Sequence, residues 1–274
     1  MIFCNIAKFS ISVYSPVQLA VEFAKYYVTS VNLHGIHSPF VYALTEQVIY
    51  NSGHYYSYKT IENLRSQLLE DNREIDILDL GAGSKFGNTK KKRISAIAKN
   101  AAKPVKFGQL IFRLCDYLHP KTVLELGTSL GLTTAYLAAA NSESKIYSLE
   151  GCPETAKTAA DNFKKLNLKN IQQIVGNFDD TLPQLIPDLP QIDLAFFDGN
   201  HRYKPTMEYF HSCLPKATND SLFIFDDIHW SQEMEQAWEE IKAHPSVSLT
   251  IDLFFIGLVF FKKGREKEHF VIRF

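Results

Sequence analysis

The sequence of 274 residues has few cysteines and no cysteine pair of the metal-binding kind. Its four cysteines are far apart, and no C-x-x-C motif occurs, which argues against a zinc ribbon and against a disulfide framework. A reducing compartment is the default for such a chain, so we expect a cytoplasmic protein. The cysteines are Cys4, Cys115, Cys152 and Cys213.

The sequence also lacks an excess of either charge and any long apolar run. Lys and Arg number 29 and Asp and Glu number 30, a formal net charge of −1. This balance argues against a strongly basic nucleic-acid coat and a highly charged disordered chain, and we expect no nucleic-acid partner. No run reaches the roughly 18 apolar residues of a membrane-spanning helix, and we expect no membrane partner. Residues 1–14 are fairly apolar without the basic cluster and cleavage site of a signal peptide, so we expect a lead-in to the first helix.

What is present is a chain with enough apolar residues for a sizeable core, in two parts of different texture. Hydrophobic residues make up 46% and aromatic residues 13%. Amphipathic spacing predicts helices over 16–30, 40–49 and 60–70, so we expect residues 1–104 to form a helical N-terminal extension. Apolar segments in this extension could support a homodimer. The second part, residues 105–274, is predicted to be an α/β domain.

From Lys121 onward, short β-branched or aliphatic runs alternate with helical patterns. Such alternation predicts βαβ crossovers and a doubly wound, mostly parallel sheet with helices on both faces. The β-rich end of the chain (247–253, 256–261 and 269–274) is expected to form an antiparallel closing edge. The predicted strands are 122–126, 145–149, 171–175, 192–197 and 222–225, and the predicted helices are 132–140, 154–166, 206–214 and 231–242.

Two strand-then-glycine segments compete for the role of a nucleotide-binding loop. The first, 77–83, runs into a basic cluster at Lys90–Arg93, which we expect to be a solvated loop. The second, 123–134, has the required context, because a helical run starts at Gly131 and a further strand ends at Glu150. We therefore assign the second loop to the cofactor and expect the first to be a structural turn or a loop beside the site.

The second loop does not have the spacing of a dinucleotide fingerprint. Its glycines are Gly127-x-x-x-Gly131, and Glu125 lies two residues before the first. A carboxylate there is poorly placed for a pyrophosphate but suits a cationic end such as an amino group.

The pattern Glu125-x-Gly127-x-x-x-Gly131-x-Thr133 resembles motif I of class I S-adenosylmethionine-dependent methyltransferases. It is most similar to the catechol and caffeoyl-CoA type O-methyltransferases, which commonly lack the glycine that other relatives carry where Ser129 stands. The resemblance covers about residue 105 to the C-terminus. It implies a Rossmann-like sheet of seven strands in the order 3-2-1-4-5-7-6, with S-adenosyl-L-methionine as cofactor.

The resemblance also implies roles for matched positions. Gly127 and Thr128 would wrap the methionine part of the cofactor, with Glu125 near its amino end. Glu150 would hold the ribose hydroxyls, and Asn177 and Phe178 would lie near the adenine. The other predicted cofactor-binding residues are Ser129, Gly131, Gly151 and Asp198.

Acidic residues follow two neighbouring predicted strands, at Asp198 and at Asp226-Asp227. Because parallel strands bring their carboxyl ends to one edge, these side chains should meet beside the glycine loop. Three carboxylates together need a cation or protons, and hard oxygen ligands suit Mg²⁺ or another divalent cation. The resemblance implies the same metal ligands, although its catechol-type members typically carry asparagine where Asp227 stands. Asp227 could instead cap the following helix.

His201 is the candidate general base, with Asp198 as its catalytic partner. The resemblance places a base at this position, and histidine suits the role because its unperturbed pKa is about 6.5. The alternative is a turn residue or one that stacks on the cofactor. His229 is expected near the N-terminus of the helix that begins at Ser231.

These expectations favour a methyltransferase that transfers a methyl group from S-adenosylmethionine to an oxygen of a small molecule, with or without a divalent metal. The first rival is a methyltransferase acting on a macromolecule. The segment Asp198-Gly199-Asn200-His201 stands where amino-group methyltransferases often carry Asn/Asp-Pro-Pro-Tyr/Phe, which argues against that class. The other rivals are a cofactor-binding protein without transferase activity and a metal-dependent enzyme on the same fold.

Overall fold

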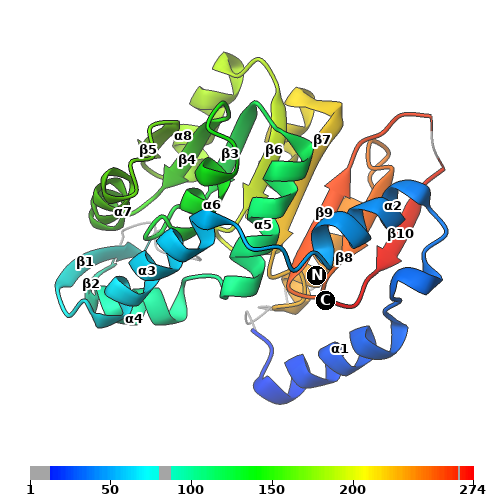
Figure 1. Ribbon diagram of the computed structural model, residues 1–274, viewed down its shortest axis with the longest axis horizontal. Coiled ribbons are helices and arrows are strands. Elements are labelled where there is room, and N and C mark those ends of the chain that lie inside the picture. The colour runs from blue at the N-terminus through cyan, green and yellow to red at the C-terminus, as the bar shows by residue number, and fades with distance from the viewer. Residues whose placement is uncertain (1–12, 80–87, 265) are drawn as a thin grey trace, which may run out of the picture.

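The computed structural model describes residues 13–79, 88–264 and 266–274, and one eight-stranded sheet runs across it (Figure 1). The strand order is β10-β8-β9-β7-β6-β3-β4-β5, and every neighbouring pair is parallel except those that β9 makes with β7 and β8. The strands are β3 Thr122–Leu126, β4 Lys145–Glu150, β5 Ile171–Val175, β6 Ile192–Phe197, β7 Ala217–Asp226, β8 Leu249–Asp252, β9 Ile256–Phe260 and β10 Glu268–Val271.

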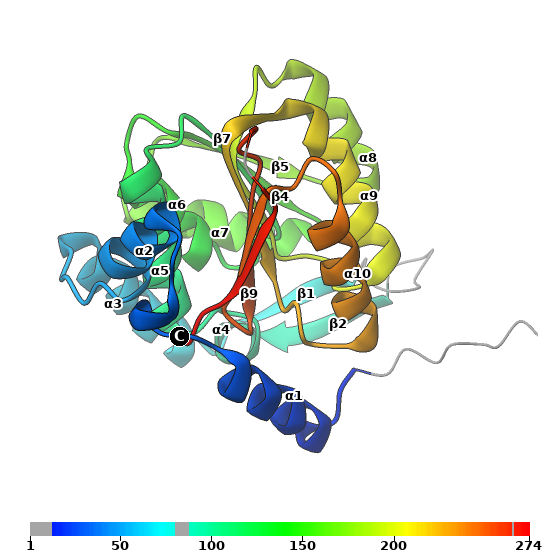
Figure 2. The same ribbon diagram turned by 90° about the vertical axis from the view of Figure 1, so that its right-hand side faces the viewer.

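Helices cover both faces of this sheet, as Figure 2 shows nearly edge-on. The central strands are buried on both sides, and successive residues face opposite cores. Phe196 and Ile224 face the core under α5 and α6, whereas Phe197 and Phe225 face the core under α8, α9 and α10. Continuous apolar runs are therefore needed in these strands. The helices are α5 Val105–Leu118, α6 Leu132–Ala140, α7 Pro153–Lys165, α8 Phe178–Leu185, α9 Tyr203–Cys213 and α10 Gln232–Ala243.

The seven strands β3 to β9 lie in the predicted order 3-2-1-4-5-7-6, but the sheet has an eighth strand, β10. We expected the C-terminal segment to extend an antiparallel edge, and this was wrong for β10, which pairs parallel with β8. Strand β10 follows β9 in the sequence but lies on the other side of β8. The alternating sequence predicts a strand there, but it does not say which neighbour the strand will pair with.

We expected the N-terminal residues to be helical, but part of this region forms strands. A two-stranded antiparallel sheet, β1 (Glu74–Asp79) with β2 (Asn88–Arg93), lies between two helices of this region. The basic cluster at Lys90–Arg93 is exposed as predicted, but it is part of β2 rather than a loop. The glycines of the first candidate loop, Gly81 and Gly83, lie outside the described residues. The helices are α1 Pro16–Thr29, α2 Pro39–Leu44, α3 Tyr56–Glu70 and α4 Ile94–Asn100, and a π-helical turn, Thr45–Ile49, follows α2.

Helix α2 and its π-helical turn share a hydrophobic core with α5 and the sheet. Leu44 and Val48 are fully or almost fully buried there. The guanidinium of buried Arg113, on α5, donates to the backbone carbonyls of Val48 at 2.7 Å and Ile49 at 3.4 Å. These bonds supply donors to carbonyls at the end of the turn, which would otherwise be buried without a partner. None of the helices in the described ranges has the length and apolarity needed to cross a bilayer.

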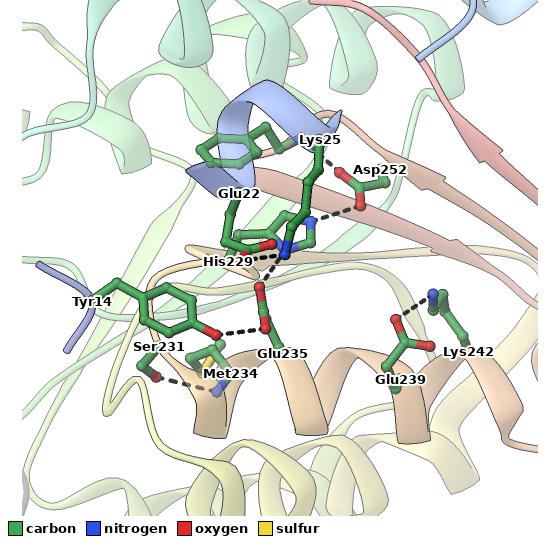
Figure 3. A network of polar contacts seen from close by, with 11 residues as sticks. Tyr14, Glu22, Lys25, His229, Ser231, Met234, Glu235, Glu239, Lys242 and Asp252 are labelled. Carbon is green, nitrogen blue, oxygen red and sulfur yellow. Dashed lines mark hydrogen bonds and ion pairs between the residues drawn. The ribbon is translucent and has the colours of Figure 1, made fainter. Parts of the chain in front are cut away.

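A polar network centred on His229, in the segment after β7, joins the segment before α1 to the end of β8 (Figure 3). The imidazole bridges two carboxylates, with Nε2 2.8 Å from Asp252 and Nδ1 3.2 Å from Glu235. Tyr14, just before α1, donates its hydroxyl to Glu235 at 2.7 Å. As predicted, His229 lies close to the start of a helix, α10, whose N-cap is Ser231.

The ionisation of His229 should make folding stability depend on pH. Burial disfavours the imidazolium, but hydrogen bonds and charge from Asp252 and Glu235 outweigh burial and raise the pKa of His229 to about 9. Since the folded-state pKa is raised, the stabilisation is complete below the unfolded-state pKa of about 6.5 and is lost as pH rises through about 9.

We expect His229→Gln to remove this dependence. Between pH 6 and pH 10 the wild type should lose up to about 3 kcal/mol of unfolding free energy that the variant does not lose. Urea unfolding at several pH values measures the difference, and His54→Gln, at an exposed loop position, is the matched control. Parallel pH profiles for the wild type and His229→Gln would contradict the assignment.

Candidate functional site

A cavity of about 350 Å³ lies at the carboxyl ends of the central strands. The loops after β3, β4, β5, β6 and β7 all contribute to its wall, as the topology argument predicts. Nine of the predicted site residues line it, and residues of the N-terminal part, among them Leu78, Asn100 and Ala101, complete the wall. The nine are Gly127, Ser129, Glu150, Gly151, Asn177, Phe178, Asp198, His201 and Asp227.

Four predicted residues lie outside this lining. Glu125, Thr128 and Asp226 are buried, and Gly131 is the N-cap of α6. Thr128 lines a smaller adjoining hollow together with Gly127, Ser129 and Asp198.

The glycine loop requires glycine because two backbones meet there. Gly127 has φ +107°, and a Cβ at this position would lie 2.2 Å from the backbone oxygen of Asp198. Gly131 has φ +80°, and its Cβ would lie 2.5 Å from the ring of Phe163 on α7. The backbone N–H of Asp198 donates to the Leu126 carbonyl at 2.9 Å. The loops after β3 and β6 therefore form one wall of the cavity with the backbone of Gly127 uncovered.

Glu150 ties two loops together at the end of β4. Its Oε2 accepts a hydrogen bond from the backbone N–H of Ser129 at 2.7 Å, and its Oε1 accepts one from Cys152 at 2.8 Å. Each carboxylate oxygen can accept a further bond, and Glu150 lines the cavity. Cys152 is tied to β1 in turn, because its Sγ accepts from Leu78 at 3.3 Å.

Glu125 is fully buried at the base of the glycine loop. Its Oε2 accepts hydrogen bonds from Thr134 and Ser148, both at 2.5 Å, while Oε1 has no hydrogen-bond partner among the described residues. Burial raises the pKa of Glu125 to about 8, although the two hydroxyl donors oppose the shift. A contact between this carboxyl group and a cofactor amino group stays a prediction.

The three predicted carboxylates meet, and Lys103 lies among them. The Lys103 ammonium contacts Asp226 Oδ2 and lies 3.6 Å from Asp198 Oδ1 and 4.0 Å from Asp227 Oδ1. Burial opposes the charge on Lys103, but the three carboxylates outweigh burial and raise its pKa. Burial and the neighbouring Asp198 raise the pKa of Asp226, whereas Lys103 and His201 overcome burial at Asp198 and lower its pKa.

His201 lies at the same cluster. Its Nε2 is 3.5 Å from Asp198 Oδ1, and its side chain is mostly buried. Burial alone would lower the pKa of His201, but the hydrogen bond and charge of Asp198, with the charge of Asp227, raise it above 6.5. Imidazole and carboxylates are suitable divalent-metal ligands, and one ligand atom each from Asp198, His201 and Asp226 lie within 4.8 Å of one another. The Lys103 ammonium is a cation already placed among these donors, so metal ligation stays a prediction.

The second interpretation of Asp227, as the cap of the following helix, was wrong. Ser231 caps α10, accepting from the Met234 N–H at 3.2 Å. Asp227 instead has φ +54°, a left-handed conformation that aspartate and asparagine tolerate better than most residues, and its side chain lines the cavity.

Sequence reasoning missed Lys103 because the predicted domain boundary fell at residue 104. Lys103 directly precedes Pro104, the N-cap of α5. A helix that leads into a parallel strand starts at the carboxyl edge of the sheet, and α5 leads into β3. That topological rule, applied to the residue before the helix, could have placed Lys103 at the site.

The central part of the chain is similar to known proteins. Residues 124–228, from β3 to the turn after β7, match a family model described as a methyltransferase domain. A catechol O-methyltransferase from Niastella koreensis is 32% identical over 126 residues, which are 45% of this chain and 55% of that protein. The match thus spans about half the length of this relative.

Solved structures share the fold at low sequence identity. An O-methyltransferase from Bacillus cereus in complex with S-adenosylhomocysteine aligns with a TM-score of 0.53 at 18% identity, covering 79% of this chain and 94% of that one. A methyltransferase from Podospora anserina bound to S-adenosylhomocysteine aligns with a TM-score of 0.58 at 13% identity, covering 93% and 99%. The chain therefore has the Rossmann-like α/β fold that these proteins share.

The close approach at Gly127 predicts the effect of a single methyl group. Gly127→Ala should lower the unfolding free energy by at least about 3 kcal/mol, because the cost of a strained φ and the cost of an overlap with backbone atoms are summed. Gly264→Ala is the matched control, since Gly264 also has positive φ (+75°) but no atom within 4 Å of the added Cβ, and it should cost about 1 kcal/mol. Equal losses in urea unfolding would show that the contact with Asp198 does not matter.

Proposed function

We propose that this protein, whose residues 124–228 match a family model described as a methyltransferase domain, transfers a methyl group from S-adenosylmethionine to an oxygen of a small molecule. The observation that carries the proposal is the convergence at one cavity of the glycine loop, Glu150 and the Asp198–His201 pair. The matched catechol O-methyltransferase and the shared fold support it.

The residues around the cavity fit S-adenosylmethionine. The uncovered backbone at Gly127 would hold the methionine end, and the spare acceptor capacity of Glu150 suits two ribose hydroxyls. Asn177 and the ring of Phe178 line the part of the cavity assigned to the adenine. When bound, S-adenosylmethionine supplies a methyl group on a positively charged sulfur.

The chain's own residues would then manage the acceptor and its proton. An acceptor hydroxyl between the glycine loop and His201 would give its proton to an imidazole nitrogen, which would leave its oxygen free to take the methyl group. Asp198 holds the other side of the ring and stabilises the imidazolium that forms. Holding the acceptor hydroxyl and His201 in a fixed geometry at a mostly buried site would contribute further to the rate enhancement.

We also propose a cellular location and a mode of self-association. The chain would act in the cytoplasm, in keeping with its few cysteines. It could form a homodimer through α1, where Val17, Val21 and Val28 are exposed.

The cofactor assignment predicts a specific loss on changing Glu150. Titration with S-adenosylhomocysteine by calorimetry should give binding to the wild type and about 10-fold or weaker binding to Glu150→Gln, since bonds to a charged acceptor are worth about 1.5–3 kcal/mol. Glu143→Gln, exposed before the amino end of β4, should bind as the wild type does. Undiminished binding by Glu150→Gln would remove Glu150 from the cofactor site.

The base assignment predicts a separation of turnover from cofactor affinity. With phenolic acceptors and radiolabelled S-adenosylmethionine, His201→Ala should lower kcat about 10²–10⁴-fold, the usual worth of a general base. Its affinity for S-adenosylhomocysteine should stay unchanged. A matching loss in both quantities would mean that His201 contributes to binding only.

The same assignment fixes the direction of the pH dependence. The base must be neutral, and the pKa of His201 is raised above 6.5. Wild-type kcat should therefore rise with pH through a pKa above 6.5, and a profile that falls over this range would contradict the role.

A further inference from the structure

The group at the centre of the carboxylate cluster is the ammonium of Lys103. We propose that Lys103 is a built-in cation that takes the place of a divalent metal and holds the acceptor oxygen, so that methyl transfer needs no metal. The role of Lys103 toward the acceptor rests on the function proposed above, whereas its role as the cation of the cluster does not.

The position of Lys103 is fixed by the fold. Proline at position 104 restricts Lys103 to extended backbone conformations. Pro104 begins α5, which is anchored in the core by fully buried Leu110 and Ile111. The side chain of Lys103 is 14% exposed and reaches two carboxylates, Asp198 in the loop after β6 and Asp226 at the end of β7. Such an ammonium cannot leave the cluster without leaving Asp226 buried and uncompensated.

The charges of the cluster are consistent with a resident monovalent cation. Asp226 is fully buried and contacts the ammonium with Oδ2, while its Oδ1 has no hydrogen-bond partner among the described residues. A divalent ion bound by Asp198 and Asp226 would lie within a few ångströms of the ammonium and be repelled by it. Lysine and metal therefore compete for the same oxygens.

The ammonium also faces the reaction space. Lys103 lines the cavity together with Asp198, His201 and Asp227. Its contact with Asp226 is its one hydrogen bond to the described residues, since 3.6 and 4.0 Å to the other carboxylates exceed hydrogen-bond length. An ammonium has three N–H donors, so it can donate to an acceptor oxygen in the cavity.

This arrangement specifies a class of acceptor. As His201 takes the hydroxyl proton, negative charge grows on the acceptor oxygen, and the ammonium stabilises it. One oxygen is sufficient, because an ammonium donates single hydrogen bonds and does not chelate two neighbouring oxygens. We therefore expect a molecule with a single ionisable hydroxyl, such as a simple phenol, to be a substrate without a vicinal second oxygen.

Metal binding tests the cation role without any need for the substrate. The experiment titrates Mn²⁺ into metal-stripped full-length protein and follows free Mn²⁺ by electron paramagnetic resonance. The wild type should show no stoichiometric Mn²⁺ binding at micromolar concentration. Lys103→Met removes the charge at similar length and should bind Mn²⁺ at least about 100-fold more tightly, because a repulsive charge within a few ångströms is gone.

Two further variants keep the result interpretable. Lys103→Arg retains a cation and should resemble the wild type in lacking Mn²⁺ binding. Lys106→Met is the matched control, because Lys106 lies on α5 but its ammonium packs over the ring of Phe274, and it should also resemble the wild type.

Stoichiometric Mn²⁺ binding by the wild type would overturn the proposal, whatever the variants do. So would a folded Lys103→Met protein, with a wild-type circular dichroism spectrum, that gains no Mn²⁺ affinity. Titration of the same samples with S-adenosylhomocysteine tests the proposed function separately. If S-adenosylhomocysteine did not bind but Lys103→Met gained Mn²⁺ affinity, the cofactor assignment would be refuted and the cation role of Lys103 would stand. Methyl transfer to phenol in the presence of EDTA tests the acceptor class. The acceptor class would be overturned if phenol were not methylated and if catechol were methylated only after Mg²⁺ is added back.

Discussion

The electrostatic balance of three carboxylates and one lysine at the ends of β6 and β7 is the constraint on which the site depends. Asp226, the last residue of β7, is fully buried, and Asp198, which directly follows β6, has a mostly buried side chain, so neither carboxylate is fully solvated. A charge in such a place must be paired or protonated. Lys103 supplies the pairing, and in doing so it brings the start of α5 to the site.

The glycine loop depends on the same strand ends. The backbone of Asp198 lies where a side chain at position 127 would be, so the two loops can meet only with glycine there. Glu150 adds a third loop through hydrogen bonds to the backbone at Ser129 and Cys152. The wall assigned to the cofactor is thus built from contacts to the backbone of loops that follow neighbouring strands, which makes its geometry depend on the sheet.

The N-terminal residues belong to this design rather than standing beside it. Helix α2 and its π-helical turn contribute buried side chains to the core under α5, the helix that Lys103 and Pro104 precede. Strand β1 reaches the cavity through Leu78, next to Cys152. Tyr14, just before α1, is hydrogen-bonded to Glu235, which together with Asp252 at the end of β8 flanks His229. The extension therefore affects both the stability of the sheet and the shape of the site.

Much of the central fold and of the candidate site could be predicted from the sequence, because continuous apolar runs and glycine spacing are local signals. The strands β3 to β7 and the convergence of Gly127, Glu150 and Asp198 at one edge follow from the alternation of strands and helices. The partner of β10 could not be predicted, since a strand pattern does not encode its neighbour. Strand β2 was missed because charged residues such as Lys90–Arg93 have low strand preference, so its pairing with the strand before Gly81 was missed too. Lys103 was missed because a lone lysine before a helix has no motif, and only the three-dimensional arrangement gives it partners.

A crystal structure of the protein grown with S-adenosylhomocysteine and Mn²⁺ would test the account most directly. We predict the nucleoside in the described cavity, with its ribose hydroxyls on Glu150 and its sulfur directed toward Asp198, His201 and Lys103. The Lys103 ammonium should stay among the carboxylates, with no anomalous Mn²⁺ signal there. Density for the nucleoside elsewhere, or a Mn²⁺ ion on Asp198 and Asp226 with Lys103 turned away, would contradict the account.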